Sequence, residues 1–196
     1  MIDSYDKLTL GKWLELKDVD TEQEEIDVQV DILSILSDLT PDEIMALPLP
    51  EYSKLVNDSM FLSKEPPIIK KLPKTITIDG KEFDIVQKVE TITAGQYIDY
   101  QAYLKDNNVP YILTCFIIPK GKKYGEGYSL EETSQLFKDY LPIGIAIGIS
   151  RFFFALWETL TESMMDSSIK QVRKSVRKMK IPLKQKVKIL AQLRSL

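Results

Sequence analysis

The sequence predicts a mainly helical (α+β) fold, with two bundle-like helical halves and one β-hairpin near residues 74–86. Three observations carry this prediction. An eight-residue motif that suits a helix start occurs twice, as Thr9-Leu-Gly-Lys-Trp-Leu-Glu-Leu16 and as Thr93-Ala-Gly-Gln-Tyr-Ile-Asp-Tyr100. The segment Thr40-Pro-Asp-Glu43 has the residue types of a capped helix start. Asp79-Gly80 lies between two stretches in which apolar and polar residues alternate, as in a hairpin.

Four helices are expected in the first 66 residues. A threonine just before a helix stabilises it, because the hydroxyl accepts a hydrogen bond from an otherwise unpaired backbone N–H. At Thr40 the next residues are a proline suited to the first turn and an acid that completes a capping box. The expected helices run from Thr9 to about Asp18, from Thr21 to about Leu39, from Thr40 to about Leu47 and from about Glu51 to Leu62.

The second half is expected to begin with the hairpin and to continue with helices. Asp79-Gly80 is typical of a type I′ turn between strands. The run from Pro110 to Ile118 is apolar throughout, so its pattern fits helix or strand, and the parallel with the first half favours helix. Further helices are expected from Thr93 to about Asp106, from the capping-box segment Ser129-Leu-Glu-Glu132 to about Tyr140, and around Ser150-Arg-Phe-Phe-Phe154.

The two halves share one order of features: the motif helix, a turn, an apolar run, a capped helix start and more helix. This order indicates an internal duplication, whereas the motif alone does not, because only two of its eight positions are identical. The break Glu65-Pro66-Pro67 separates the halves. We therefore divide the chain into an acidic helical unit (1–66), a hairpin-plus-helix unit related to it (67–166) and a basic amphipathic helical tail (167–196).

The sequence gives little support for a membrane role. The opening residues, Met1-Ile-Asp-Ser-Tyr-Asp6, lack the basic segment and apolar core of a signal peptide, so none is expected. The apolar stretch from Leu141 to Trp157 is short for a span, and Arg151 near its centre would add about 2.5–3.5 kcal/mol to insertion. We expect a buried core helix there, and no membrane partner.

The composition argues against an enzyme. The 196 residues include no histidine, which removes the most common general base and metal ligand. The single cysteine, Cys115, lies in an apolar run where a buried, inert thiol is expected. The adjacent acids Glu24/Glu25, Asp42/Glu43 and Glu131/Glu132 lie near expected helix starts, where acids stabilise the helix dipole. No phosphate-binding loop or nucleophile elbow occurs, and we predict no catalytic residue, metal or cofactor.

Charge is divided between the two ends of the chain. Residues 1–66 hold sixteen Asp and Glu against five Lys, a net charge of −11, whereas residues 167–196 hold ten Lys and Arg and no acid. The basic tail could bind an acidic face of its own or a neighbouring subunit, contact nucleic-acid phosphates, or form a solvated helix face. Its candidate contacts to a partner or a phosphate are Arg173, Lys174, Arg177 and Lys178.

The segment from Lys120 to Tyr128 is a second candidate contact site. It combines three lysines, three glycines and two tyrosines. It could be a mobile surface loop, or a loop that binds a partner, because glycine allows close backbone approach and tyrosine adds stacking area. The candidate contact residues are Lys120, Lys122, Lys123, Tyr124 and Tyr128.

Five segments of the chain carry a family resemblance. They are Tyr5-Asp-Lys-Leu-Thr-Leu-Gly-Lys-Trp-Leu-Glu-Leu16, Ile35-Leu-Ser37, Leu47-Pro-Leu-Pro-Glu-Tyr52, Ile92-Thr-Ala-Gly-Gln-Tyr-Ile-Asp-Tyr-Gln101 and Ile118-Pro-Lys-Gly-Lys-Lys-Tyr-Gly-Glu-Gly-Tyr128. Together they resemble a family of small proteins from tailed phages of gut Bacteroidota, including crAss-like phages. The resemblance covers most of residues 5–157 and is weaker in the basic tail.

The resemblance implies a role in the phage particle. Such a protein is made late in infection and is a virion-associated structural or cargo protein, present in the host bacterial cytoplasm during assembly. The alternative is a tail-assembly chaperone that is not retained in the virion. The implied partners are other phage structural proteins and copies of the same chain. Nucleic acid remains an alternative partner of residues 167–196.

Overall fold

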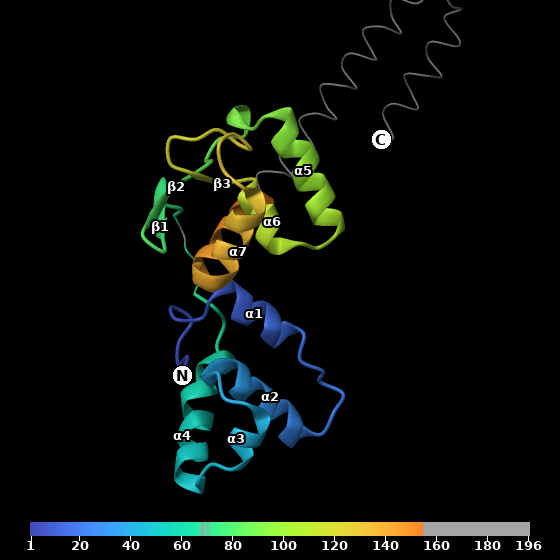
Figure 1. Cartoon of the computed structure of the whole chain (residues 1–196), viewed down its shortest axis with the longest axis vertical. Helices are drawn as coiled ribbons and strands as arrows, with labels where there is room; N and C mark the ends of the chain where they lie inside the picture. The colour runs from blue at the N-terminus through green and yellow to red at the C-terminus, as the bar shows by residue number, and fades with distance from the viewer. Residues whose placement is uncertain (68, 70, 155–196) are drawn as a thin grey trace, which may run out of the picture. The chain divides into compact units, whose positions relative to one another are not determined.

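The computed structural model describes residues 1–67, 69 and 71–154. It is mainly helical with a small three-stranded antiparallel sheet, as the sequence predicts (Figure 1). The chain divides into two compact units, Met1–Arg151 and Phe152–Leu196, and the following description concerns the first. The predicted basic tail lies outside the described residues.

Four helices and one 3₁₀ turn make up the N-terminal part (Figure 1). The hydroxyl of Thr9 caps the first helix by accepting from the backbone N–H of Lys12. Thr40 and Glu43 form the predicted capping box, in which each side chain bonds to the other residue's backbone N–H. The elements are α1 (Leu10–Lys17), α2 (Glu25–Ser37), α3 (Pro41–Met45), α4 (Leu49–Ser59) and η1 (Met60–Ser63).

Two predicted boundaries in this part are wrong. Helix α2 begins at Glu25 rather than Thr21. The carboxylate of Asp20 accepts from the backbone N–H of Glu22, and this local turn competes with a helix. Helix α4 begins at Leu49 rather than Glu51, because Pro50 is accommodated in its first turn.

The hairpin prediction is confirmed. Strand β1 (Thr75–Ile78) pairs antiparallel with β2 (Lys81–Ile85), and Ile76 lies opposite Phe83. Asp79 and Gly80 have φ values of 47° and 71°, the left-handed conformations that a type I′ turn requires. The apolar residues of both strands face the core, so this side of the hairpin is covered.

The apolar run at 110–118, whose pattern fitted helix or strand, is helix and then strand, so the preference for helix is correct only for its first part. The side chain of Asn108 caps helix α6 (Val109–Thr114), and Pro110 fits its first turn. Strand β3 (Ile117–Pro119) then adds to the hairpin, with Ile117 opposite Ile85. Pairing with β2 therefore decides the conformation where the apolar pattern does not.

The remaining elements match their predicted starts. Helix α5 (Ala94–Lys105) has Thr93 as its cap, with Gln96 completing a capping box. Helix α7 (Leu130–Tyr140) is capped by Ser129, and residues 143–154 are helical. A short turn, η2 (Val89–Thr91), precedes α5. Within the described part of the chain, no helix combines the length and apolar character needed to span a membrane.

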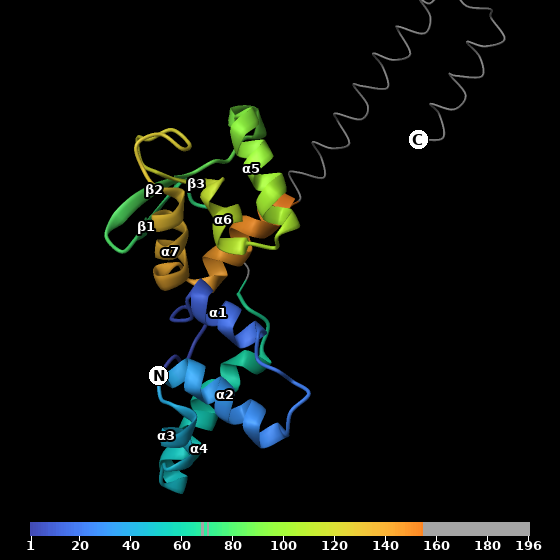
Figure 2. The ribbon, with the colours of Figure 1, turned by 45° about the vertical axis from the view of Figure 1, so that its right-hand side comes forward.

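The main core lies where α7 meets the sheet and α1. The rings of Phe83 and Phe137 pack edge to face, with centroids 5.5 Å apart, and both side chains are buried. Helix α1 lies against the end of α7 (Figure 2). The backbone N–H of Leu10 donates to the carbonyl of Leu141, and that of Ile143 donates to Leu8. The first and last described segments of this unit are thereby joined.

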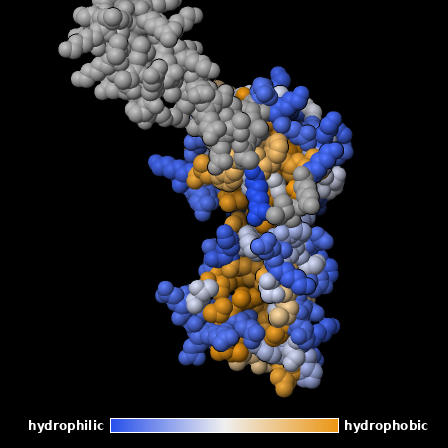
Figure 3. All heavy atoms as spheres, turned by 180° about the vertical axis from the view of Figure 1, so that it is seen from behind, coloured by the Kyte–Doolittle hydropathy of each residue, from blue (hydrophilic) through white to orange (hydrophobic). Residues whose placement is uncertain are grey.

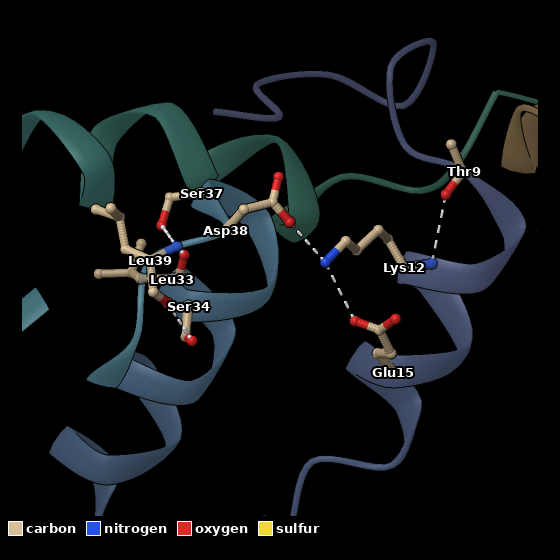
Figure 4. A network of polar contacts seen from close by, with 8 residues as sticks. All are labelled: Thr9, Lys12, Glu15, Leu33, Ser34, Ser37, Asp38 and Leu39. Carbon is tan, nitrogen blue, oxygen red and sulfur yellow. Dashed lines mark hydrogen bonds and ion pairs between the residues drawn. The ribbon is translucent and has the colours of Figure 1, made fainter. Parts of the chain in front are cut away.

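A smaller core lies between α2, α3 and α4. Its buried members are Val30, Leu33 and Ile44, and side chains of α4 pack against them without becoming fully buried. A polar contact connects α1 to the end of α2, where the ammonium group of Lys12 pairs with Asp38 at 2.8 Å and with Glu15 at 3.4 Å (Figure 4). The hydrogen bond that the Lys12 ammonium donates to Asp38 is the main reason that the pKa of Lys12 is raised.

Candidate functional site: the loop at residues 120–128

The predicted contact loop is attached to the sheet at its start. The backbone N–H of Lys120 donates to the carbonyl of Glu82 at 2.9 Å, which extends the pairing beyond β3. The Lys120 ammonium also pairs with the Glu82 carboxylate at 2.9 Å, and this hydrogen bond raises the pKa of Lys120. The backbone N–H of Gly121 donates to Asp84 at 3.4 Å. One of the predicted contact lysines is thus engaged within the chain.

A tyrosine attaches the middle of the loop to α5. The hydroxyl of Tyr124 donates to a carboxylate oxygen of Asp99 at 2.9 Å and lies 3.7 Å from the sulfur of Cys115. The Tyr124 side chain is half-buried, and this burial raises the pKa of its hydroxyl. The hydroxyl therefore remains protonated and able to donate at any physiological pH.

The Tyr124 hydroxyl lies next to the fully buried thiol of Cys115. Cys115 has no exposed surface, and burial raises its pKa to about 12. The thiolate is the reactive form of cysteine, so the thiol is suited to packing rather than to nucleophilic chemistry. The expectation of a buried cysteine is confirmed.

The second copy of the repeated motif supplies the supports of this site. Gln96 is buried: its amide oxygen accepts from the backbone N–H of Thr93, and its amide nitrogen donates to the carbonyl of Cys115 at 3.0 Å. Asp99 lies three residues further on, hence on the same face of α5. In the first copy, Lys12 and Glu15 occupy the corresponding positions and pair with each other instead.

The end of the loop closes on itself. The backbone N–H of Gly125 donates to the hydroxyl of Tyr128 at 3.3 Å, and the backbone N–H of Glu126 donates to the carbonyl of Lys123 at 3.0 Å. Gly127 has a φ of 73°, and a Cβ there would lie 3.2 Å from the ammonium nitrogen of Lys122. The positive φ favours glycine at this position, whereas the exposed Lys122 side chain could move away from an added Cβ.

The arrangement presents two ammonium groups to solvent. Lys122 and Lys123 are exposed, and neither has an ion-pair partner among the residues that the structure describes. Three of the five predicted contact residues, Lys120, Tyr124 and Tyr128, instead hold the loop in place. The sequence did not reveal Gln96 and Asp99 as supports, although their spacing in the motif was visible.

The other predicted contact residues are not brought into this site. Arg173, Lys174, Arg177 and Lys178 lie outside the described residues. In the ranges that are described, no three His, Cys, Asp or Glu side chains are grouped so that they could hold a metal ion. The chemistry that the loop offers is the binding of anionic groups by Lys122 and Lys123.

The hydrogen bond between Tyr124 and Asp99 is expected to contribute about 1.5 kcal/mol to stability, because its acceptor is charged and the pair is half-buried. A double-mutant cycle with Tyr124→Phe and Asp99→Ala, followed by urea unfolding, measures this coupling. Tyr111→Phe is the matched control, since the Tyr111 hydroxyl has no hydrogen bond to another described residue. A coupling energy near zero would mean that this contact does not fix the loop.

Comparison of the chain with protein-family models, with curated proteins and with solved structures found no match in any of the three.

Proposed function

We propose that the chain is a non-enzymatic, virion-associated structural or cargo protein of a bacteriophage that acts through protein–protein contacts. The observation that carries the proposal is the loop at 120–128, which presents Lys122 and Lys123 on a backbone that is attached to the rest of the fold at its start and middle and closed by its own hydrogen bonds at its end. A loop that is already ordered loses little conformational entropy when it binds, so more of the contact energy appears as affinity.

The proposed partner surface is acidic. Two adjacent ammonium groups that pair with no carboxylate among the described residues favour the carboxylates of a partner, and such ion pairs at an interface mainly determine specificity and association rate. The partner would be another phage structural protein, in keeping with the resemblance noted for segments that include Ile118–Tyr128. The proposed location is the virion, with the host bacterial cytoplasm as the site of assembly.

A tail-assembly chaperone that leaves before the particle is complete is the second candidate. Large apolar side chains exposed at the surface favour it, because a chaperone holds apolar segments of another protein. Ile98, Met45 and Leu49 are 64%, 66% and 75% exposed. This candidate predicts a different distribution in the infected cell, with the protein abundant in the soluble extract and missing from virions.

The proposal is tested by separating infected cells into purified particles and soluble extract and measuring the chain in both by mass spectrometry. A structural or cargo protein remains with particles through density-gradient purification. Its absence from purified particles would refute the proposal.

A further inference from the structure

All charged residues of the segment 18–53 are acidic: it holds eleven Asp and Glu and no Lys or Arg. It forms α2, α3 and the start of α4. Only Asp38 among these eleven acids has an ion-pair partner within the described residues, and that partner is Lys12. This surface therefore carries a large negative charge that the described part of the chain leaves uncompensated.

The same segment exposes large apolar side chains. Ile26 lies between Glu25 and Asp27 in the first turn of α2 and is 46% exposed, while Met45 and Leu49 are more exposed still. Helix α4 has no fully buried residue. Viewed from behind, hydrophobic side chains reach the surface between hydrophilic ones over the part built from α1 to α4 (Figure 3). We call this combined surface of residues 18–53 the acidic face.

The segment with the complementary chemistry is in the chain itself. Residues 167–196 contain ten Lys and Arg and no acid. Their apolar residues recur at helical spacing, so one amphipathic segment offers both cations and an apolar stripe. The stripe residues are Ile169, Val172, Val176 and Met179.

We propose that the acidic face binds residues 167–196 of a second copy of this chain. The contact joins two different surfaces, so it is head-to-tail, and each added copy offers a new acidic face and a new basic segment. Such growth suits a particle component, and in this respect the inference rests on the proposed function. Most of the acids of the acidic face are exposed, so the association should weaken as salt screens them.

Analytical ultracentrifugation of the full chain tests the inference. At about 50 mM salt the weight-average mass should rise with protein concentration, and at about 500 mM it should fall toward that of the monomer, because the added salt shortens the screening length to about 4 Å and weakens the attraction between exposed charges. A wild-type chain that stays monomeric at every concentration in low salt would overturn the proposal, including the case in which the basic segment folds onto its own chain.

Two charge-reversed pairs locate the contact. Glu25→Lys with Asp27→Lys should weaken association at least about tenfold. Glu131→Lys with Glu132→Lys is the matched control, because it makes the same charge change in the first turn of α7 and removes the same favourable dipole interaction. Equal weakening by both pairs would show a net-charge effect and would contradict a specific acidic face.

A mixing experiment distinguishes a variant that has lost the contact from a variant that does not associate because it is misfolded. The acidic-face variant should recover association when mixed with a chain that carries Arg173→Glu, Lys174→Glu, Arg177→Glu and Lys178→Glu. No recovery, in chains that melt cooperatively by circular dichroism, would count against the pairing.

Binding of the wild-type tail to DNA with no self-association would assign it to nucleic acid instead. A protein found in virions yet monomeric would refute this inference alone.

Discussion

Cys115 in the native protein is expected to react with iodoacetamide about 1,000-fold more slowly than in the unfolded chain at pH 8. The cause is the thiol pKa, which burial raises from 9.0 to about 12, so the thiolate fraction falls by three powers of ten. The rate is measured by mass spectrometry of the labelled peptide, with the chain in guanidinium as the reference.

The same shift has a consequence for stability. The folded pKa lies above the unfolded value, so the contribution of the protonated thiol is complete below pH 9 and is lost as pH rises toward 12. If Cys115 in the native protein were labelled at a rate within about tenfold of the unfolded rate, this result would contradict the burial of its thiol beneath the loop.

Gly11→Ala is expected to destabilise the fold by about 1–3 kcal/mol, because a Cβ at this position would lie 2.9 Å from the backbone carbonyl oxygen of Lys138. The obstacle is backbone rather than a flexible side chain, so α1 must move away from α7. That movement weakens the hydrogen bond between Leu10 and Leu141, which joins the two ends of the core.

Gly95→Ala is the matched control. Both glycines occupy the second helical position of their motif copy, and neither has a positive φ. Around Gly95 the nearest contact of an added Cβ is 3.9 Å away, so alanine should be neutral or stabilise by up to about 1 kcal/mol through helix propensity. Urea unfolding of both variants measures the difference. Equal effects would show that the approach of α1 to α7 does not depend on Gly11.

Local signals in the sequence predicted much of the fold. The caps at Thr9, Thr40, Thr93 and Ser129 were correct because capping depends on residues within one turn of each other. The hairpin was correct for the same reason, since Asp79-Gly80 determines the turn and the alternation determines the buried face.

The errors arose where a distant segment decides the structure. Strand β3 follows α6 because β2 offers a free edge, and no pattern within 110–118 reveals that edge. Gly11 packs against Lys138, which lies 127 positions further along the chain (138 − 11), so no local pattern in the sequence distinguishes Gly11 as a packing residue from Gly95.

For the candidate loop, too, the local features were predicted from the sequence and the distant contacts were not. Its composition identified the segment and five candidate contact residues, but it did not distinguish Lys122 and Lys123 from the three that hold the loop in place. The roles of Tyr124 and Asp99 depend on a contact across 25 residues that places the loop over α5, and this contact requires the fold. The repeated motif therefore has two uses: its first copy packs α1 closely on α7, and its second copy supports the loop.

The most direct test of the proposed function is the amount of this chain per purified particle. The account predicts that wild-type protein remains with particles, and that Lys122→Glu with Lys123→Glu lowers its amount at least about tenfold if the loop makes the contact. Lys81→Glu with Lys105→Glu, which changes two exposed lysines outside the loop, should leave the amount unchanged. Wild-type protein confined to the soluble extract of infected cells would contradict the account.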